Sequence, residues 1–234
     1  MSEDTLSPAT VERVLTRFGF SKAPAPTRAG LEEVYLAWGR HIPFDNVRKR
    51  IALTRGDAGG LPGGTAEEFF TAWLRHGPGG TCWPTSNGMY MLLRALGFDV
   101  RRIAASMQDM GMPNHGSVIA RIEDEEVLVD SSILCERPIP LRRDGKLELD
   151  DPVHPIRIEP AGDLWLLHWG FTMSQEMMPC RLLEDPVDLP FYLKRYEISR
   201  EMSPFNASLY GRRNREGDTP TSLENRLMNV PKLL

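Results

Sequence analysis

The sequence predicts an α+β fold in which a helical N-terminal region packs on an antiparallel β-sheet or barrel. Apolar residues recur at helical spacing through the first third of the 234-residue chain, and short strand-like runs separated by turns begin near Val100. Helices followed by strands are typical of the α+β class. We therefore expect a helical region over 1–98, an antiparallel β region over 99–194 and a short C-terminal region with a polar tail over 195–234.

Three amphipathic helices are expected before a glycine-rich turn. The first follows Ser7-Pro8, because serine is a favoured N-cap and proline loses no hydrogen bond in a first turn. The second occupies 31–40 and the third 66–76, each with aromatic residues on its apolar face. The prolines of 23–26 predict an extended link, since the residue before a proline is biased away from helix.

A fourth helix is expected after the turn Gly77-Pro78-Gly79-Gly80-Thr81. Apolar residues recur at three- and four-residue steps over 89–96, and Gly97 supplies a left-handed stop. Pro84 is compatible with this helix because it lies in the first turn. Cys82 would then occupy the helix N-terminus, where unpaired N–H groups and the helix dipole favour a thiolate. The alternative is a buried cysteine that packs at a tight corner.

Short strands are expected beyond this helix, because apolar or alternating runs are bounded there by turn residues. A connector is expected over 185–193 and a last short element over 195–202, and the chain from Arg212 onward has the polar composition of poorly ordered segments. The predicted strands lie at 100–105, 116–122, 127–130, 156–159 and 164–169.

Two of these strands form a hairpin with His115 at one end and Asp130 at the other. A turn centred on Glu123-Asp124 would place Asp130 opposite Ser117, on the same face as His115 and one diagonal step away. A turn centred one residue later would place Asp130 opposite Ile119, too far from the histidine without a bulge. We favour the first register, because only that one lets the two side chains meet.

Cys82, His115 and Asp130 together have the chemistry of an activated nucleophile. The imidazole would take or share the thiol proton, which gives a thiolate–imidazolium pair. A carboxylate on the far ring nitrogen would fix the tautomer and stabilise the imidazolium. Each residue alone has an ordinary alternative as a packed cysteine, a strand-end histidine or a turn cap. The combination favours catalysis.

Motifs around these residues resemble the arylamine N-acetyltransferase family, a branch of the papain- and transglutaminase-like cysteine enzymes. The family's Arg-Gly-Gly-aromatic-Cys-Phe-Glu segment, and a helix that ends in Leu-Gly-Phe, are similar to residues 78–84 and 92–98. The family's histidine before a hairpin and its Leu-Val-Asp match His115 and Leu128-Val129-Asp130. The resemblance covers roughly residues 10–210.

Two further motifs are Ile42-Pro43-Phe44-Asp45-Asn46, similar to the family's Ile-Pro-Phe-Glu-Asn, and Ser203-Pro204-Phe205, which matches its Ser-Pro-Phe. The chain also departs from the family. Pro78, Thr81 and Pro84 replace the family's arginine, aromatic residue and glutamate, and residues 131–134 lack the glycines of the family's Gly-Phe-Gly segment.

The resemblance implies a cysteine-protease-like (transglutaminase-like) core with a shortened C-terminal region. It implies that Phe44 and Phe205 wall an acceptor pocket by aromatic stacking, although both could be ordinary core aromatics. Met107, in a methionine-rich loop that runs into His115, would line an adaptable pocket or fill the core. Arg212, with Arg213 and Arg215 beyond it, would hold coenzyme A phosphates or form a solvated surface cluster.

The leading interpretation is an N-acyltransferase with an acyl-cysteine intermediate. It would use no bound cofactor, take acetyl or another acyl group from coenzyme A as acyl thioester co-substrate, and pass it to an arylamine or related small-molecule amine. The second is an amide synthase that takes acyl groups from a carrier protein in polyketide or peptide biosynthesis. The third is a non-catalytic ligand-binding relative, whose thiol would be unreactive.

Composition disfavours several other classes. A chain that is 41% hydrophobic can bury a sizeable core, and a net charge of −4 argues against nucleic-acid binding. Three widely spaced cysteines indicate neither a disulfide framework nor a metal site. No signal-like start and no long apolar run are present, so we expect no membrane association and a cytoplasmic location, where thiols stay reduced.

Overall fold

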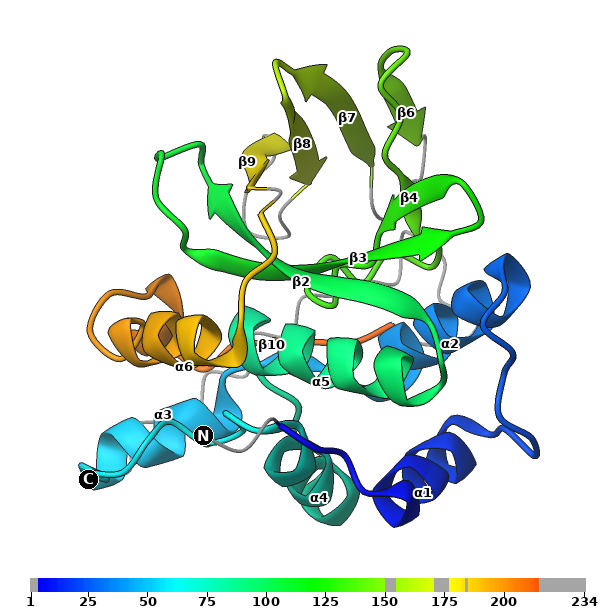
Figure 1. Cartoon of the computed structure of the whole chain (residues 1–234). Helices are drawn as coiled ribbons and strands as arrows, with labels where there is room; N and C mark the ends of the chain where they lie inside the picture. The colour runs from blue at the N-terminus through cyan, green and yellow to red at the C-terminus, as the bar shows by residue number, and fades with distance from the viewer. Residues whose placement is uncertain (1–3, 150–154, 171–176, 184, 215–234) are drawn as a thin grey trace.

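A computed structural model describes residues 4–149, 155–170, 177–183 and 185–214. A helical layer lies beneath a barrel-like antiparallel sheet, and the helix α5 (Cys82–Ala95) packs against both the sheet and other helices (Figure 1). This arrangement confirms the predicted α+β class. None of the helices in the described part of the chain is long and apolar enough to cross a bilayer.

The helices begin where the capping residues allow. Ser7 and Thr65 each accept a hydrogen bond from a first-turn N–H, and Asp188 does the same for the last helix, whose first turn contains a proline. The helices are α1 (Pro8–Phe18), α2 (Arg28–His41), α3 (Val47–Arg55), α4 (Ala66–His76), α5 (Cys82–Ala95) and α6 (Leu189–Ile198), and η1 (Pro204–Asn206) is a 3-10 turn.

Eight antiparallel strands form the main sheet in the order β5-β4-β3-β2-β9-β8-β7-β6, and a small sheet pairs β1 (Phe44–Asp45) with β10 (Gly211–Arg212). Strand β9 inserts between β2 and β8, so the two halves of the sheet join into one surface. The eight strands are β2 (Asp99–Met107), β3 (His115–Ile122), β4 (Glu125–Leu128), β5 (Ile139–Pro140), β6 (Leu147–Leu149), β7 (Ile156–Ala161), β8 (Leu164–Gly170) and β9 (Met177–Leu183).

Several local expectations are corrected. The connector expected at 185–193 contains the start of α6, which ends at Ile198 rather than Met202. Neither α3 nor β9 was expected from the sequence, and Arg212, which was expected in the polar tail, lies in β10. The rest of that tail, 215–234, lies outside the described residues. The division into three regions stays a prediction, and α6 crosses its second boundary.

Helix α5 lies inside the hydrophobic core and is buried along most of its length. Strands β2 and β3 cover one side of it and α4 covers another. The rings of Trp38 and Phe69 stack at 6.1 Å, and Phe69 packs so close to Gly88 that a Cβ there would lie 2.9 Å from the ring. A glycine at this point therefore lets α4 and α5 approach. Each buried aromatic or aliphatic side chain contributes about 1.5–3 kcal/mol of transfer free energy.

Candidate active site

The turn before α5 places Cys82 at the first helical residue, as the sequence predicted. Its side chain is 9% exposed. Gly79 packs so tightly that a Cβ would lie 2.0 Å from the Pro43 carbonyl oxygen, and Gly80 bridges to the backbone of Phe44. Asp45 Oδ2 accepts a hydrogen bond of 2.7 Å from the Gly79 N–H. The segment with the Pro-Phe-Asp motif thus holds the turn that carries the cysteine.

The β3–β4 hairpin has the register that we favoured. Ile122 pairs with Glu125 across a turn at Glu123-Asp124, and Glu123 takes a left-handed φ of 56°. Asp130 lies just beyond the end of β4, at Leu128, rather than inside the strand. The same register places it near His115, and Asp130 Oδ2 lies 2.7 Å from His115 Nε2.

The His115–Asp130 pair is almost completely buried, with 4% and 1% of the two residues exposed. Burial raises the pKa of Asp130, but the charge and hydrogen bond of His115 outweigh it and hold that pKa below its ordinary value. The backbone N–H groups of Ser132 and Ile133 also donate to Asp130 Oδ1, at 2.8 and 3.2 Å. These contacts favour an ionised carboxylate.

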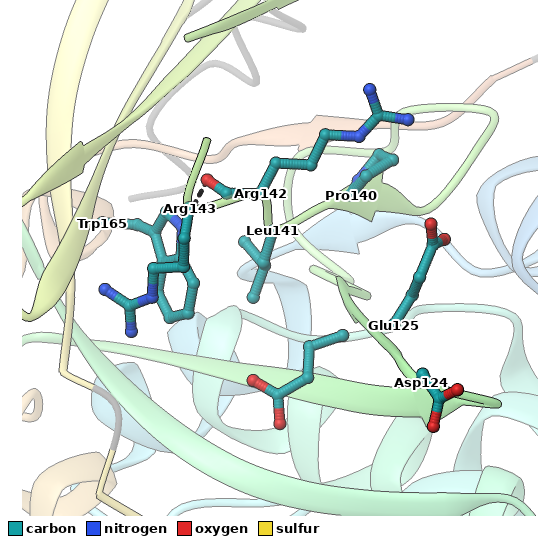
Figure 2. A pocket seen from close by; sticks show the side chains of 8 residues that line it. Asp124, Glu125, Pro140, Leu141, Arg142, Arg143 and Trp165 are labelled. Atoms are coloured by element: carbon teal, nitrogen blue, oxygen red, sulfur yellow. Dashed lines mark hydrogen bonds between the residues drawn. The ribbon is translucent and has the colours of Figure 1, made fainter. Parts of the chain in front are cut away.

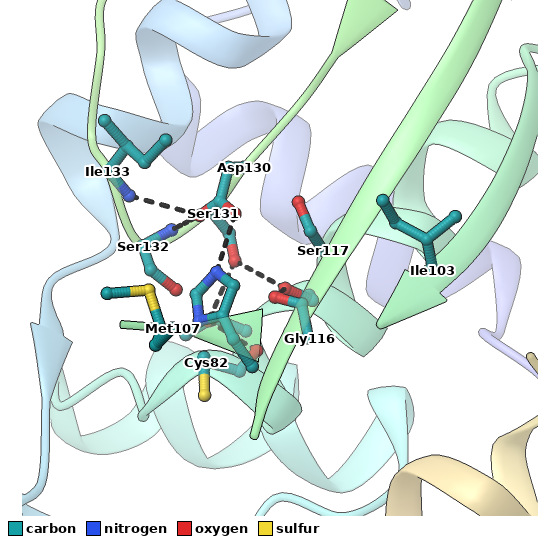
Figure 3. Close-up of polar contacts among 12 residues, drawn as sticks. Cys82, Ile103, Met107, Gly116, Ser117, Asp130, Ser131, Ser132 and Ile133 are labelled. Carbon is teal, nitrogen blue, oxygen red and sulfur yellow. Dashed lines mark hydrogen bonds and ion pairs between the residues drawn. The ribbon is translucent and has the colours of Figure 1, made fainter. Parts of the chain in front are cut away.

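The thiol of Cys82 acts on the same imidazole. Burial lowers the pKa of His115, but the charge and hydrogen bond of Asp130, followed by those of Cys82, raise it to about 10. Because Nε2 faces the carboxylate, Nδ1 is the ring nitrogen left for the thiol. Figure 3 shows Cys82 at the start of its helix, below the turn that carries Asp130 in this view, with Met107 drawn nearby. The structure therefore brings together the three residues that the sequence singled out as an activated set.

A buried hydroxyl network behind this set was not foreseen. Ser86 Oγ donates to the Gly116 carbonyl at 2.7 Å and lies 3.1 Å from Ser131 Oγ. Ser131 in turn donates to Thr85 Oγ1 at 2.9 Å. The network joins the helix that starts at Cys82 to the residues that follow the histidine and the aspartate. Two adjacent hydroxyl residues near the start of the helix, Thr85 and Ser86, were the sequence signal for it.

Phe44 and Phe205 meet beside the cysteine turn, with ring centroids 5.3 Å apart at 72°. Tyr210, which the sequence analysis missed, joins them at 5.9 Å from Phe44. Asn46 holds two of these aromatic residues in place through their backbones. Its Nδ2 donates to the Phe205 carbonyl at 2.6 Å, and its Oδ1 accepts from the Tyr210 N–H at 2.8 Å. Phe44 itself is only 4% exposed, so it contributes at most an edge to a ligand.

Met107 ends β2 opposite Cys180 and is partly buried near the reactive centre. The other two methionines of its loop, Met110 and Met112, are 59% and 39% exposed and therefore do not form a closed pocket in this structure. Asn114 closes the loop, because its side chain bonds to both the N–H and the carbonyl of Met107.

A shallow hollow of about 280 Å³ lies elsewhere, on β4, β5 and β8 (Figure 2). Its lining includes the Arg143 guanidinium, 3.6 Å from the Trp165 ring centroid, and acidic residues of the hairpin turn. Cys82, His115 and Asp130 do not line it, so it is not the candidate active site. Within the described ranges, no group of three or more His, Cys, Asp or Glu side chains could hold a metal ion.

A cysteine at a helix N-terminus thus lies in one site with a histidine and an aspartate of an adjoining antiparallel sheet. Solved structures share this fold. The chain resembles arylamine N-acetyltransferases from Salmonella typhimurium, Mycobacterium marinum and Bacillus cereus with TM-scores of 0.72, 0.73 and 0.71 at 19%, 17% and 16% identity. The matches cover 89%, 88% and 90% of this chain and 76%, 78% and 84% of those chains. The Bacillus cereus protein is described as having a Cys-His-Glu catalytic triad.

Sequence comparison agrees. An arylamine N-acetyltransferase of Mycolicibacterium smegmatis is 29% identical over 90 residues, and an uncharacterized acetyltransferase of Bacillus subtilis, YvcN, is 28% identical over 167 residues. These matches cover 38% and 62% of this chain but only 30% and 61% of the two relatives. No family model matches. The expected resemblance to the arylamine N-acetyltransferase family is confirmed, and the chain has the fold of that family.

Proposed function

We propose that this protein is an N-acyltransferase that carries its acyl group on Cys82. The observation that supports this most directly is the buried His115–Asp130 hydrogen bond of 2.7 Å beside a cysteine at a helix N-terminus. The similarity to arylamine N-acetyltransferases suggests acetyl-coenzyme A as the donor and an arylamine as the acceptor.

In the first half-reaction, the Cys82 thiolate attacks the thioester carbonyl of the donor. The backbone N–H of Cys82, which has no intrahelical acceptor because it lies in the first turn of α5, would donate to the oxyanion and lower the barrier by about 2.7–4 kcal/mol. The carbon–sulfur bond to the donor then breaks. The departing thiolate takes the proton of the His115 imidazolium, which leaves an acyl-cysteine and a neutral imidazole.

In the second half-reaction, the amine attacks the acyl-cysteine carbonyl. The neutral imidazole of His115 accepts the proton that the amine loses, and the bond to the Cys82 sulfur breaks. The products are an amide and the original thiolate–imidazolium pair. Asp130 keeps the imidazole in one tautomer through both steps, because its carboxylate holds the Nε2 proton.

An amide synthase that accepts acyl groups from a carrier protein is the second candidate. The observation that favours it is the segment after Asp130, where residues 131–135 are buried and contain no glycine. The carbonyls of Ile133 and Leu134 accept hydrogen bonds from the protein's own Arg212 and Asn214. A donor could not use these carbonyls without displacing those side chains.

Intact-protein mass spectrometry tests the proposal. Incubation with acetyl-coenzyme A, other acyl-coenzyme A thioesters and acylated carrier proteins is expected to add one acyl mass that maps to Cys82. Cys82→Ser, a near-isosteric control, should not form the thioester adduct. An adduct from carrier proteins alone would favour the amide synthase. A ligand-binding relative would instead be favoured by two results together. No donor would form an adduct, and Cys82 would be alkylated in mild acid as slowly as an unactivated cysteine.

A further inference from the structure

Arg212 on β10 is a half-buried residue whose guanidinium bonds to backbone carbonyl oxygens. Its Nη2 donates to the backbone oxygens of Ser132 and Ile133, the second at 2.9 Å. Its Nε is buried and has no hydrogen-bond partner among the described residues. Taking part of a guanidinium out of water is costly unless its N–H groups are hydrogen-bonded. The two backbone carbonyls provide such hydrogen bonds within the described part of the chain.

The two carbonyls belong to the turn that holds Asp130. The N–H groups of Ser132 and Ile133 donate to Asp130 Oδ1 at 2.8 and 3.2 Å. The peptide group between Ser132 and Ile133 thus accepts from Arg212 at its oxygen and donates to Asp130 at its nitrogen. Hydrogen bonds in such a chain polarise one another. The cation is thereby linked to the carboxylate through a single peptide group.

Burial lowers the pKa of Arg212, and the nearby groups Tyr210, Asp130 and Tyr35 oppose that shift. Tyr35 of α2 contacts the same turn, because its hydroxyl donates to the Asp130 carbonyl at 2.6 Å. The backbone of Arg212 pairs with Phe44 in the small sheet, which fixes the arginine relative to the cysteine turn.

We propose that Arg212 is a positioning residue that clamps the turn at residues 130–133 and so keeps the Asp130 carboxylate aimed at His115. The inference rests on the proposed function, since it assigns Arg212 a part in organising the same site. Arg212 touches no reacting atom. It acts through the peptide group and through Asp130.

The test compares Arg212→Met, which removes charge and donors, with Arg212→Gln, which keeps a donor, and Arg212→Lys, which keeps a charge. Arg137→Met is the matched control, because Arg137 is exposed in the segment that follows the same turn. The measurements are the acyl-transfer rate, the titration of His115 by NMR and the thermal midpoint. We expect Arg212→Met to slow transfer by about tenfold to a hundredfold, the worth of a hydrogen bond to a charged group. Arg212→Lys should recover part of that loss.

The sign of the His115 shift separates positioning from simple charge removal. Loss of a nearby cation by itself would raise the pKa of His115, whereas a misdirected Asp130 would lower it. We expect a lower titration midpoint in Arg212→Met and no change in Arg137→Met. An unchanged or raised midpoint would overturn the proposal. If Arg212→Met does not fold, the same criterion is applied to Arg212→Gln.

Failure of the proposed function would look different. A wild-type protein that takes no acyl group from any thioester would reject the transferase, while the His115 titration in the Arg212 variants would still report whether the clamp exists.

Discussion

Asp130 receives hydrogen bonds on both carboxylate oxygens. His115 occupies Oδ2, and the amides of Ser132 and Ile133 occupy Oδ1. A carboxylate held in this way has one available orientation, so the imidazole that it binds also has one. The third residue of the site is therefore fixed by backbone geometry as well as by its own charge.

Replacing Asp130 with asparagine removes the charge of the side chain while nearly preserving its size and shape. The amide of Asp130→Asn can present an N–H to Nε2, which would select the wrong histidine tautomer and leave Nδ1 protonated when it should be a base. The acyl-transfer rate is expected to fall by about 10⁴-fold, with the fold intact by circular dichroism. A near-normal rate would mean that Asp130 has no role in orienting His115.

At the scale of elements, the hydroxyl network joins three segments that carry the site. Helix α5 contributes Thr85 and Ser86, β3 contributes the Gly116 carbonyl, and the turn after β4 contributes Ser131. All three hydroxyl residues are at most 1% exposed, so each hydrogen bond forms without competition from water. The network sets the distance between the helix with Cys82 and the strands with its partners.

Ser131→Ala is expected to lower the free energy of unfolding by about 0.5–1.5 kcal/mol, because it removes the hydrogen bond to Thr85 Oγ1 and the contact with Ser86 Oγ, whose hydroxyls both keep backbone partners. Urea denaturation measures this, and the transfer rate should fall because α5 loses its tie to the Asp130 turn. Ser132→Ala is the matched control. The Ser132 hydroxyl is buried with no hydrogen-bond partner among the described residues, so its removal should cost little. Equal effects of the two substitutions would contradict the network's role.

Local signals predicted the elements that carry the reactive residues. The helix at Cys82 followed from a glycine-rich turn and regular apolar spacing, and the hairpin register followed from period-two geometry between His115 and Asp130. Strand β9 was missed because Pro179 interrupts it, and prolines usually exclude an inner strand. Helix α3 was missed because only Lys49 and Ala52 are buried on it, which leaves almost no apolar periodicity.

Other parts of the site depend on tertiary contacts. Arg212 reaches the Asp130 turn from about 80 residues further along the chain, and no local pattern reports such a contact. Helix α6 did carry local signals, Asp188 as an N-cap and Pro190 in the first turn. The proline was instead interpreted as part of a connector.

For the whole molecule, the site lies where the helical layer meets the sheet. Cys82 comes from α5, and His115 and Asp130 come from the hairpin that covers it. Strand β10 is connected to this junction through Phe44, which pairs with Arg212 of β10 and with Gly80 of the turn before Cys82. The reactive geometry therefore depends on the docking of the layers, and the buried pair should in turn stabilise that docking.

The contribution of the His115–Asp130 pair to global stability should depend on pH. Although burial lowers the pKa of His115, Asp130 and then Cys82 raise it from 6.5 to about 10. That contribution is fully present below about pH 6.5 and is lost as pH rises through about 10. Asp130 has a lowered pKa, because the His115 charge outweighs burial, so its contribution is present above about pH 3.8 and is lost as pH falls further.

The difference in unfolding free energy between wild type and Asp130→Asn should therefore be largest between about pH 4 and 6.5, at roughly 3 kcal/mol. It should shrink steadily toward pH 10. Taking the difference between the two proteins cancels the pH dependence that other titrating groups give to both. The main such group is Lys49, whose pKa is lowered to about 8 by burial and which would otherwise change the unfolding free energy at alkaline pH. Urea denaturation of both proteins across this range measures the difference. A difference that stays constant from pH 5 to pH 10 would show that the buried pair does not gain a proton on folding, and the imidazolium at the centre of the proposed mechanism would then be absent at rest.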